Sequence, residues 1–366
     1  MTSDPIETRK STEGMVDYNR NSTAQQQHAI MQADHIRRLV GKLGRVEPEL
    51  RLVDYGCGPG MSAIETVRPA IAAYRARHPD APIVVCHADQ AGNDWNALFG
   101  LVAGPGGYLA GNAPLRVEAA VGSFYERLAA ENSVSLGTCF FASHWLSHAV
   151  RLDAPGTVLF DHLQGAARAQ LTEVAQRDWC TFLRHRAAEL RQGGYLLASM
   201  MGSVPDAAEP NGAASAGRGI YRAIQAVASA MVEDGMLDPD VLNGFVFPFW
   251  FMTEAEARDW IGADKVLSDL VEVEGIEVTP ALTNPTDLFH DAIGDPVEYA
   301  RLYTGCVKAF ADSTLRTQLF EPAARSPQDP DALADEFYRR FDAFYREHTD
   351  RYACEIWHLT VLLRRR

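Results

Sequence analysis

The feature that most constrains the fold is the alternation of short apolar runs with helical segments between about residues 50 and 200. The runs PIVVCHAD, APLRVEAAVG, VSLGTCFFAS and GYLLASMMG have the length and composition of buried strands. We expect a helix kinked by Pro69 in MSAIETVRPAIAAYRARH and a helix that ends at glycine in LTEVAQRDWCTFLRHRAAELRQGG. The alternation predicts an α/β fold, with a parallel sheet covered on both faces and ligands beyond the carboxyl ends of its strands.

The rest of the chain extends this core. One amphipathic helix is expected in STAQQQHAIMQADHIRRLVGKL, ahead of the first strand. VLSDLVEVEGIEVTP and YACEIWHLTVLLRR predict long strands, suited to an antiparallel pair that finishes the same sheet. The predicted organisation is a flexible N-terminus (1–13), a doubly wound cofactor-binding core (14–202), a mainly helical substrate cap (203–263), and the remaining core strands with inserted cap helices (264–366).

The net charge and the cysteine pattern limit the classes of partner that the chain can be expected to bind. The formal net charge of −14 argues against nucleic acid, because phosphate binding needs a positive surface. The six cysteines are scattered, with no Cys-x-x-Cys pair and no histidine at ligand spacing, which indicates free thiols and predicts no metal site. The first residues contain no apolar stretch that could serve as a signal peptide, and no later segment reaches about eighteen uninterrupted apolar residues. We therefore expect a cytoplasmic protein that binds a small molecule and makes no membrane contact.

A glycine-rich turn, DYGCGPGMS, follows the first predicted strand and precedes a helix. Gly56, Gly58 and Gly60 permit a tight turn and a close approach of a ligand to the backbone. Two cofactor classes fit this arrangement: a dinucleotide, whose pyrophosphate lies at the helix N-terminus, and S-adenosylmethionine, whose aminoacyl part lies against the loop. Glycines required for tight packing alone are a third explanation.

Two acidic residues favour S-adenosylmethionine. Asp54 directly precedes the glycines, where it suits the ammonium of a methionine moiety and would be poorly placed beside a pyrophosphate. Asp89 ends the next predicted strand, where a carboxylate can accept hydrogen bonds from both ribose hydroxyls. It lies about thirty-five residues beyond Asp54, longer than the usual dinucleotide interval of about twenty. A solvated aspartate at a strand end is the explanation of Asp89 that needs no ligand.

Seven segments in order carry a more specific signal. They are DYNRNSTAQQ, DYGCGPGMS, DQAGNDWNALF, VGSFYERL, SHWLS, FLRHRAAELRQGGYLL and MVEDGMLDPDVLNGFVFPFW. In these segments, from about residue 14 to 260, the chain resembles the SABATH methyltransferases, best known from plants. The family methylates carboxyl groups of small acids such as salicylate, benzoate, jasmonate and indole acetate, and one branch methylates xanthine-ring nitrogens.

The resemblance implies a mostly parallel, seven-stranded, Rossmann-like methyltransferase sheet with a helical cap, and a homodimer. The cofactor would be S-adenosyl-L-methionine, with S-adenosyl-L-homocysteine as its product. Matched position by position, the resemblance implies that Tyr18 and Ser22 close over the cofactor and that Asp54 and Ser62 lie near its methionine part. Asp89 would bind the ribose and Gln90 would lie beside the adenine. Ser123 and Phe124 would hold the adenine and stack on it, and Cys139 would contact the cofactor through its main chain.

Gln25 and Trp145 match the pair that the family uses for catalysis. There, a side-chain amide and an indole N–H donate hydrogen bonds to the two oxygens of the substrate carboxylate. Since a carboxylate is already ionised near pH 7, the reaction needs no general base, only placement of one oxygen against the methyl group. Neutral donors in a dry site orient that oxygen, whereas an Arg or Lys would favour the ground state. Taken singly, an exposed helix glutamine and a core tryptophan would be ordinary explanations.

The other substrate positions that match the family are apolar or aromatic. We expect His144 to form part of the wall rather than act as a base. Phe141 replaces a tyrosine of the family and Tyr221 stands where several carboxyl methyltransferases carry tryptophan, so the acid cannot be named by analogy. The full set of lining positions is Phe141, His144, Met201, Ile220, Tyr221, Phe247, Val307 and Phe310.

The leading hypothesis is an S-adenosylmethionine-dependent O-methyltransferase that converts the carboxylate of a small aromatic or apolar acid to its methyl ester. An N-methyltransferase of a heteroaromatic ring is the first alternative, because it would not need the Gln25 and Trp145 pair. An NAD-dependent oxidoreductase built on the same glycine loop is a second. A module that binds a ligand without catalysis is a third, which the presence of both members of the pair argues against.

Overall fold

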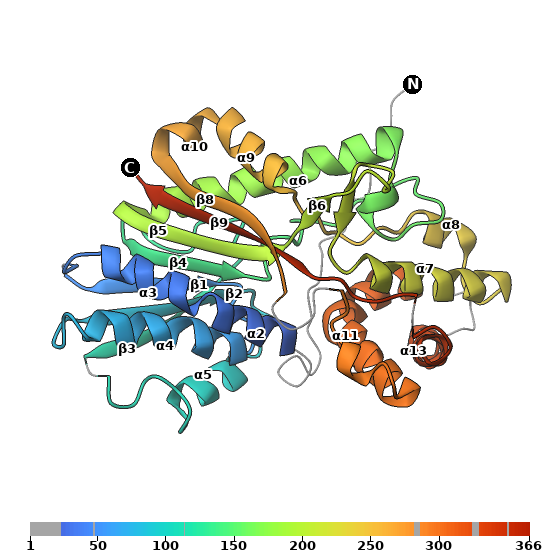
Figure 1. Ribbon diagram of the computed structural model, residues 1–366, viewed down its shortest axis with the longest axis horizontal. Coiled ribbons are helices and arrows are strands. Elements are labelled where there is room, and N and C mark those ends of the chain that lie inside the picture. The colour runs from blue at the N-terminus through green and yellow to red at the C-terminus, as the bar shows by residue number, and fades with distance from the viewer. Residues whose placement is uncertain (1–22, 47, 113, 282–285, 324–328, 350) are drawn as a thin grey trace.

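The computed structural model describes residues 23–366, apart from 47, 113, 282–285, 324–328 and 350, with side chains described from residue 27 onward (Figure 1). Its centre is a seven-stranded sheet of order β3-β2-β1-β4-β5-β9-β8. The strands are β1 (Leu50–Tyr55), β2 (Ile83–Asp89), β3 (Leu115–Val121), β4 (Val134–Phe140), β5 (Leu190–Met201), β8 (Val271–Pro280) and β9 (Trp357–Arg365). Residues 1–22, with the predicted flexible N-terminus, lie outside this description.

The pairing of the strands confirms the predicted doubly wound α/β sheet. β1 to β5 run parallel to one another, and β9 pairs antiparallel with both β5 and β8. All seven residues of β4 are buried, as expected for a strand covered on both faces. The chain runs from β1 outward to β3, then returns to place β4 on the other side of β1. The crevice between β1 and β4 at their carboxyl ends is therefore the topological switch point, where such folds bind ligands.

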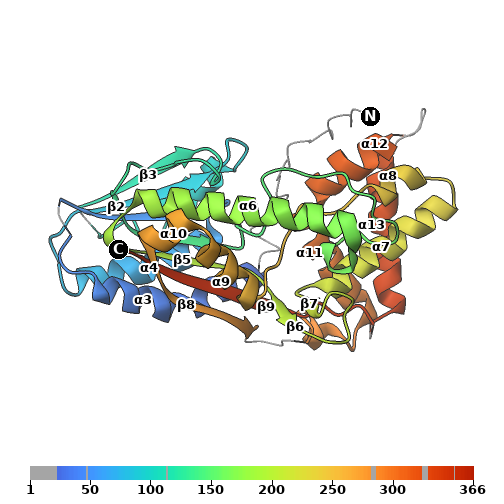
Figure 2. The ribbon, with the colours of Figure 1, turned by 90° about the horizontal axis from the view of Figure 1, so that it is seen from above.

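Helices cover both faces of the sheet. Figure 1 shows α3 and α4 below strands β4 and β5, with α6 above them, and Figure 2 shows α6 crossing over the strands. The first group comprises α2 (Thr23–Met31), α3 (Ala33–Lys42), α4 (Met61–Arg75) and α5 (Trp95–Ala103); the second comprises α6 (Gly165–Glu189), α9 (Glu254–Ala263) and α10 (Lys265–Leu270). Among the described residues, no helix is both long enough and apolar enough to cross a bilayer.

Two helices differ from the sequence-based expectation. The single helix expected before β1 is divided into α2 and α3 at Gln32, whose side chain donates a hydrogen bond to Thr360 of β9. The prediction that α6 ends at a glycine is wrong, because α6 ends at Glu189 and β5 begins at the next residue. The carbonyls of Ala188 and Glu189 accept hydrogen bonds from the backbone of the segment before β4, so the helix end needs no glycine cap. α4 runs unbroken through Pro69.

The remaining elements lie beyond the carboxyl ends of the parallel strands (Figure 1). α11 packs against α13, and α13 packs against α7. α9 and α10, in contrast, pack against α6 over the sheet, and the domain bounds stated above stay a prediction. The elements of this region are β6 (Ser203–Pro205), β7 (Ala213–Ser215), α7 (Arg218–Glu233), α8 (Pro239–Asn243), α11 (Pro296–Leu315), the π-helix η3 (Arg316–Phe320), α12 (Glu321–Ala323) and α13 (Pro330–Glu347).

Candidate active site

The glycine loop follows β1 at the switch point. Gly56, Gly58 and Gly60 have φ angles of +72°, +54° and +106°, a region that favours glycine. A Cβ atom on Gly56 would lie 2.4 Å from Cβ of Ala142, and one on Gly60 would lie 2.7 Å from Cδ1 of Leu98. Tight packing thus accounts for two of the three glycines, whatever the loop binds. The contact with Ala142 joins the glycine loop to the loop after β4.

Asp89 ends β2 beside this loop. Its two carboxylate oxygens accept hydrogen bonds from the backbone N–H groups of Gly58 and Gln90, each at 2.7 Å. Burial raises the pKa of Asp89, and the two backbone hydrogen bonds oppose that rise. A carboxylate can accept about four hydrogen bonds, so this group retains the capacity to accept two more. That capacity matches the two hydroxyls of a ribose.

Asp54, near the end of β1, is only 5% exposed. It accepts a hydrogen bond of 2.9 Å from the Thr138 hydroxyl of β4, and its other oxygen lies 3.6 Å from Nδ1 of His87 in β2. Asp54 therefore links three neighbouring strands directly under the glycine loop. The predicted contact of this carboxylate with an ammonium group stays a prediction.

The residues around the loop fit S-adenosylmethionine. Ser62 lies in the first turn of α4, and its hydroxyl is buried without a hydrogen-bond partner among the described residues. Buried hydroxyls in folded proteins normally have a partner. An orphaned hydroxyl beside a glycine loop, together with the free acceptor capacity of Asp89, is what a ligand with an amino acid part and a ribose requires.

The predicted adenine pair lies in the turn after β3. The Ser123 hydroxyl accepts a hydrogen bond from the Tyr125 backbone N–H at 3.2 Å. Phe124 is buried, and its ring meets Phe182 of α6 edge to face, with centroids 5.9 Å apart. Cys139 is fully buried in β4, and burial raises the pKa of its thiol to about 12. The roles of Ser123, Phe124 and Cys139 toward a cofactor stay predictions.

A buried ion pair supports this turn, and sequence reasoning missed it. Arg186 and Glu189 of α6 are wholly buried and joined by two N–H···O contacts of 2.8 Å. Arg186 also donates to the carbonyl of Phe124 at 2.8 Å, while Glu189 accepts from the Tyr55 hydroxyl at 2.6 Å and the Leu128 backbone N–H at 2.6 Å. The one sequence signal was an Arg and a Glu three residues apart on an apolar helix.

Trp145 lies in the loop after β4, on the other side of the switch point. It is 3% exposed, and its ring centroid lies 4.1 Å from that of Phe249. Two backbone hydrogen bonds fix the loop: Leu146 N–H to the Pro248 carbonyl at 2.7 Å, and Trp250 N–H to the His144 carbonyl at 2.9 Å. No described residue accepts a hydrogen bond from the indole N–H of Trp145. A buried indole with a free donor is suited to a polar ligand atom.

Several predicted substrate residues come together around Phe249. We call the set His144, Trp145, Tyr221, Phe247, Phe249, Phe251 and Phe310 the aromatic cluster. Ring contacts of 4.1 to 6.5 Å connect Phe249 to each other member. Phe249 and Phe251 were missed, although the alternating aromatic residues of FVFPFWF could have indicated them.

The other predicted lining residues surround the aromatic cluster. Ile220 precedes Tyr221 on α7, and Val307 lies one turn before Phe310 on α11; both are buried. Met201 ends β5, and its Cε atom would lie 3.4 Å from a Cβ on Gly217, which is also close to Tyr221. Phe141 contacts His144 at 6.4 Å and has a φ of +53°, unusual for a residue with a side chain.

Three buried histidines gather around the Phe141 ring: His28 of α2, His144, and His358 of β9, at centroid distances of 5.0, 6.4 and 5.4 Å. Burial lowers the pKa of His144 to about 3 and that of His358 to about 4. Burial, and then His358, also lower the pKa of His28 well below its usual value. All three imidazoles are therefore neutral near pH 7.

The predicted residues nearest the N-terminus are only partly covered. Tyr18 and Ser22 lie outside the described residues. Gln25 lies in α2, but its side chain is outside the description. Positions 25 and 28 lie one turn apart on α2, and the described His28 side chain is buried.

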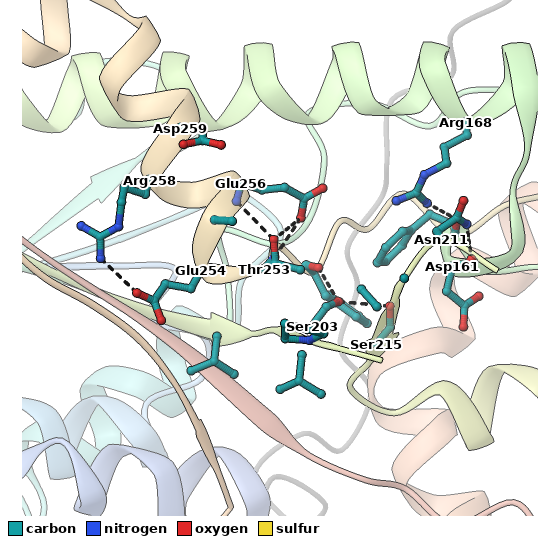
Figure 3. A pocket seen from close by; sticks show the side chains of 18 residues that line it. Asp161, Arg168, Ser203, Asn211, Ser215, Thr253, Glu254, Glu256, Arg258 and Asp259 are labelled. Atoms are coloured by element: carbon teal, nitrogen blue, oxygen red, sulfur yellow. Dashed lines mark hydrogen bonds and ion pairs between the residues drawn. The ribbon is translucent and has the colours of Figure 1, made fainter. Parts of the chain in front are cut away.

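A separate pocket of about 760 Å³ opens between α6, α9 and the β6–β7 hairpin (Figure 3). None of the residues predicted from sequence lines it. One wall is the start of α9, where Thr253 and Glu256 cap the helix reciprocally, each side chain accepting a hydrogen bond from the other residue's backbone N–H. On the other wall, Asp161 lies near His162 and Glu209.

The Arg222 guanidinium already occupies this acidic group of Asp161, His162 and Glu209. It lies 3.0 Å from both His162 and Glu209, and 4.0 Å from Asp161. A cation is therefore in place there without a metal ion. We propose no metal site at this pocket.

The doubly wound sheet, the glycine loop at its switch point and the acidic strand ends define the class of protein, a methyltransferase dependent on S-adenosylmethionine. Residues 8–366 match the family described as SAM dependent carboxyl methyltransferase, and the chain belongs to this family. The SABATH resemblance is thereby confirmed, and the methyl donor is S-adenosylmethionine. A dinucleotide-dependent oxidoreductase is no longer an alternative.

Individual relatives extend over most of the chain. Indole-3-acetate O-methyltransferase 1 of Oryza sativa subsp. japonica is 26% identical over 335 residues, covering 82% of this chain and 80% of that protein. The 3,7-dimethylxanthine N-methyltransferase TCS1 of Camellia sinensis is 23% identical, covering 89% and 88%. Among solved structures, loganic acid methyltransferase with SAH aligns over 99% of both chains, with a TM-score of 0.75 and 19% identity. That likeness shows the fold.

Proposed function

We propose that this enzyme transfers the methyl group of S-adenosylmethionine to the carboxylate of a small organic acid, forming a methyl ester, with Gln25 and Trp145 as the catalytic pair. The observation that carries the proposal is the indole N–H of Trp145, which has no acceptor among the described residues and belongs to a side chain packed in an aromatic cluster one loop away from the glycine loop. Relatives named for indole-3-acetate and for gibberellic acid are consistent with an acid as the substrate.

The chemistry divides between cofactor and protein. When bound, S-adenosylmethionine supplies an electrophilic methyl group on a positively charged sulfur. The protein has no proton to remove, because a carboxylate is ionised near pH 7. Trp145 and Gln25 would orient one carboxylate oxygen through neutral N–H donors, and the aromatic cluster would exclude water. Water stabilises separated charges more than the transition state in which they neutralise, so a dry site favours the reaction.

The lack of charge in the aromatic cluster near pH 7 supports this division of roles between the cofactor and the protein. Burial keeps His144 neutral near pH 7, so it would neither act as a base nor attract the carboxylate as a cation. The other members of the aromatic cluster carry no charge at that pH. Placement against the methyl group, worth roughly 7 to 11 kcal/mol in well-oriented systems, would then supply much of the rate enhancement.

The cofactor contacts belong to the same proposal. Their support is the free acceptor capacity of Asp89 and the orphaned hydroxyl of Ser62. The proposed cofactor residues are Tyr18, Ser22, Asp54, Gly56, Gly58, Gly60, Ser62, Asp89, Gln90, Ser123, Phe124 and Cys139; the proposed substrate wall is Phe141, His144, Met201, Ile220, Tyr221, Phe247, Val307 and Phe310, now with Phe249 and Phe251.

A methyl-transfer assay over benzoate, salicylate, anthranilate, indole acetate and fatty acids tests the proposal. We expect at least one acid to be methylated, and Gln25→Ala and Trp145→Ala to lower kcat/KM on it by more than tenfold. Trp260→Phe, in α9 over the sheet, is the matched control and should retain activity. If both variants of the pair stay within tenfold of the wild type, the assignment of the pair is wrong.

Ring nitrogens of xanthines are the second candidate acceptors, favoured by the match to the 3,7-dimethylxanthine N-methyltransferase. Xanthines belong in the same assay. Methylation of a xanthine without methylation of any acid would replace the main proposal.

We also propose that the enzyme is a cytoplasmic homodimer that takes a small molecule and neither nucleic acid nor membrane as partner. The net charge of −14 and the six free thiols support this setting. The homodimer follows from the family resemblance alone. Light scattering behind size-exclusion chromatography measures the mass, and a mass of about 40 kDa, that of one chain, would contradict it.

A further inference from the structure

The aromatic cluster contains a second polar atom that the methyl-transfer chemistry does not use. We infer that the Tyr221 hydroxyl recognises an oxygen substituent of the substrate, a hydroxyl or a carbonyl, at the end of the acid away from its carboxylate. The inference rests on the proposed function and narrows the substrate class to oxygenated acids, rather than plain hydrocarbon or unsubstituted aromatic acids.

The first support is that the Tyr221 hydroxyl lacks a partner. Tyr221 is 6% exposed, and no described residue donates a hydrogen bond to its hydroxyl or accepts one from it. Buried hydroxyls are normally hydrogen-bonded, because a group removed from water must be compensated. Six other buried tyrosines have such a partner, and the buried Tyr338 hydroxyl has none among the described residues. The six are Tyr55, Tyr74, Tyr108, Tyr299, Tyr303 and Tyr345.

The second support is that the Tyr221 ring is held in place. It contacts Phe247 at 5.3 Å, Phe249 at 5.9 Å and Phe310 at 6.0 Å between centroids. These contacts come from two different parts of the chain, the 245–251 segment and α11, so the ring is packed from more than one direction. The ring, and with it the direction of the hydroxyl, therefore cannot change without disrupting the aromatic cluster.

The third support is the position of Tyr221 relative to Trp145. Both rings contact Phe249, Trp145 at 4.1 Å and Tyr221 at 5.9 Å, so their centroids are at most about 10 Å apart. An acid with one or two rings spans that distance. His144, the other polar member, is adjacent to Trp145, with centroids 6.3 Å apart, and belongs to the carboxylate end. Tyr221 is thus the polar member of the aromatic cluster that remains to contact the end of the acid opposite its carboxylate.

The chemistry of the phenol sets the kind of substituent. Burial raises the pKa of Tyr221 well above its usual value, so the hydroxyl stays neutral and can donate as well as accept. It can therefore pair with a hydroxyl or with a carbonyl oxygen. A buried polar group that expects a partner discriminates strongly against an analogue that lacks it, since that analogue leaves the group unpaired.

Matched pairs of acids test the inference. We would compare benzoate with 4-hydroxybenzoate, cyclohexanecarboxylate with its 4-hydroxy and 4-oxo derivatives, and indole acetate with its 5-hydroxy derivative. The wild type should prefer the oxygenated member of at least one pair by tenfold or more in kcat/KM. Tyr221→Phe should lower that ratio at least tenfold, because kcat/KM falls more on the oxygenated acid than on the plain one. Tyr195→Phe, which removes the hydroxyl of a buried tyrosine of β5, should change neither.

Calorimetric binding of the same acids to enzyme saturated with S-adenosylhomocysteine gives a readout independent of turnover. The preference for the oxygenated acid should appear in Kd for the wild type and disappear in Tyr221→Phe and Tyr221→Trp. Equal binding of every matched pair by the wild type, or equal losses on both members in Tyr221→Phe, would overturn the inference. If no acid is methylated, the proposed function fails, and the binding comparison still decides the role of Tyr221.

Discussion

The two sides of the switch point are built differently. The cofactor side comes from consecutive strand ends, β1, β2 and β3, and is set by backbone hydrogen bonds to Asp89 and by the buried Arg186–Glu189 pair. The aromatic cluster comes from the loop after β4, from α7, from the 245–251 segment and from α11, and is held largely by ring packing. Binding the same cofactor requires the same arrangement of polar groups around it, whereas the rings of the aromatic cluster can be exchanged one residue at a time. Under the proposed function, substrate choice would therefore belong to the second side.

The largest expected effect comes from breaking the support of the cofactor side. Glu189→Ala leaves the Arg186 charge buried without its partner and removes the acceptor of the part-buried Leu128 backbone N–H, so the free energy of unfolding should fall by about 3–5 kcal/mol. Urea denaturation measures it. Glu254→Ala, which breaks an exposed pair with Arg258, should cost at most about 1 kcal/mol. Equal effects would mean that the buried pair is not what stabilises this side.

Asp89→Ala should weaken the affinity for S-adenosylhomocysteine by about 100-fold, equivalent to about 2.7 kcal/mol, because two hydrogen bonds to an ionised acceptor would be lost. Isothermal calorimetry measures the Kd. Asp80→Ala, an exposed aspartate before β2, is the control and should bind normally. Unchanged binding by Asp89→Ala would remove Asp89 from the cofactor site.

Gly56→Ala tests the contact between the two sides. The new Cβ would lie 2.4 Å from Cβ of Ala142, and the φ of +72° disfavours alanine, so stability should fall by about 1–3 kcal/mol. Combining it with Ala142→Gly should restore part of that loss, the part due to the clash. A double-mutant cycle of unfolding free energies with a coupling below about 0.5 kcal/mol would show that the two loops are independent.

The neutral histidines make the stability of the substrate side dependent on pH. Their pKa values are lowered in the folded state, so their contribution is complete above the unfolded value of 6.5 and is lost as the pH falls toward about 4 for His358. Each should add a slope of about 1.4 kcal/mol per pH unit in this window. His358→Gln should reduce the slope by about that amount, and the exposed His290→Gln should not. Unfolding curves between pH 6.5 and 4.5 measure both.

The smallest effect is expected for Phe249→Leu, which conserves most of the volume at the centre of the aromatic cluster. Stability should fall by about 1 kcal/mol. Activity on the best acid should fall about tenfold, since the wall that positions the substrate loosens, while the Kd for S-adenosylhomocysteine stays within twofold. A parallel loss of cofactor affinity would contradict the separation of the two sides.

The sequence by itself determined much of the fold and of the cofactor side. The periodicity of the runs between residues 50 and 200 predicted strands and helices that the structure confirms, because strand and helix formation there depends on local patterns. The glycine loop, Asp54 and Asp89 lie within about forty residues on adjacent elements, and parallel strands bring their carboxyl ends to one edge. Spacing along the chain was therefore sufficient to place these groups together.

Only the tertiary structure decided the rest. The end of α6 at Glu189 depends on backbone donors from another segment, and the burial of Arg186 depends on Tyr55 and on the turn after β3. The position of Phe249 at the centre of the aromatic cluster, and the unpaired hydroxyl of Tyr221, depend on elements separated by scores of residues. A side chain's partners are set by what packs against it in three dimensions, and no local pattern of residues contains that information.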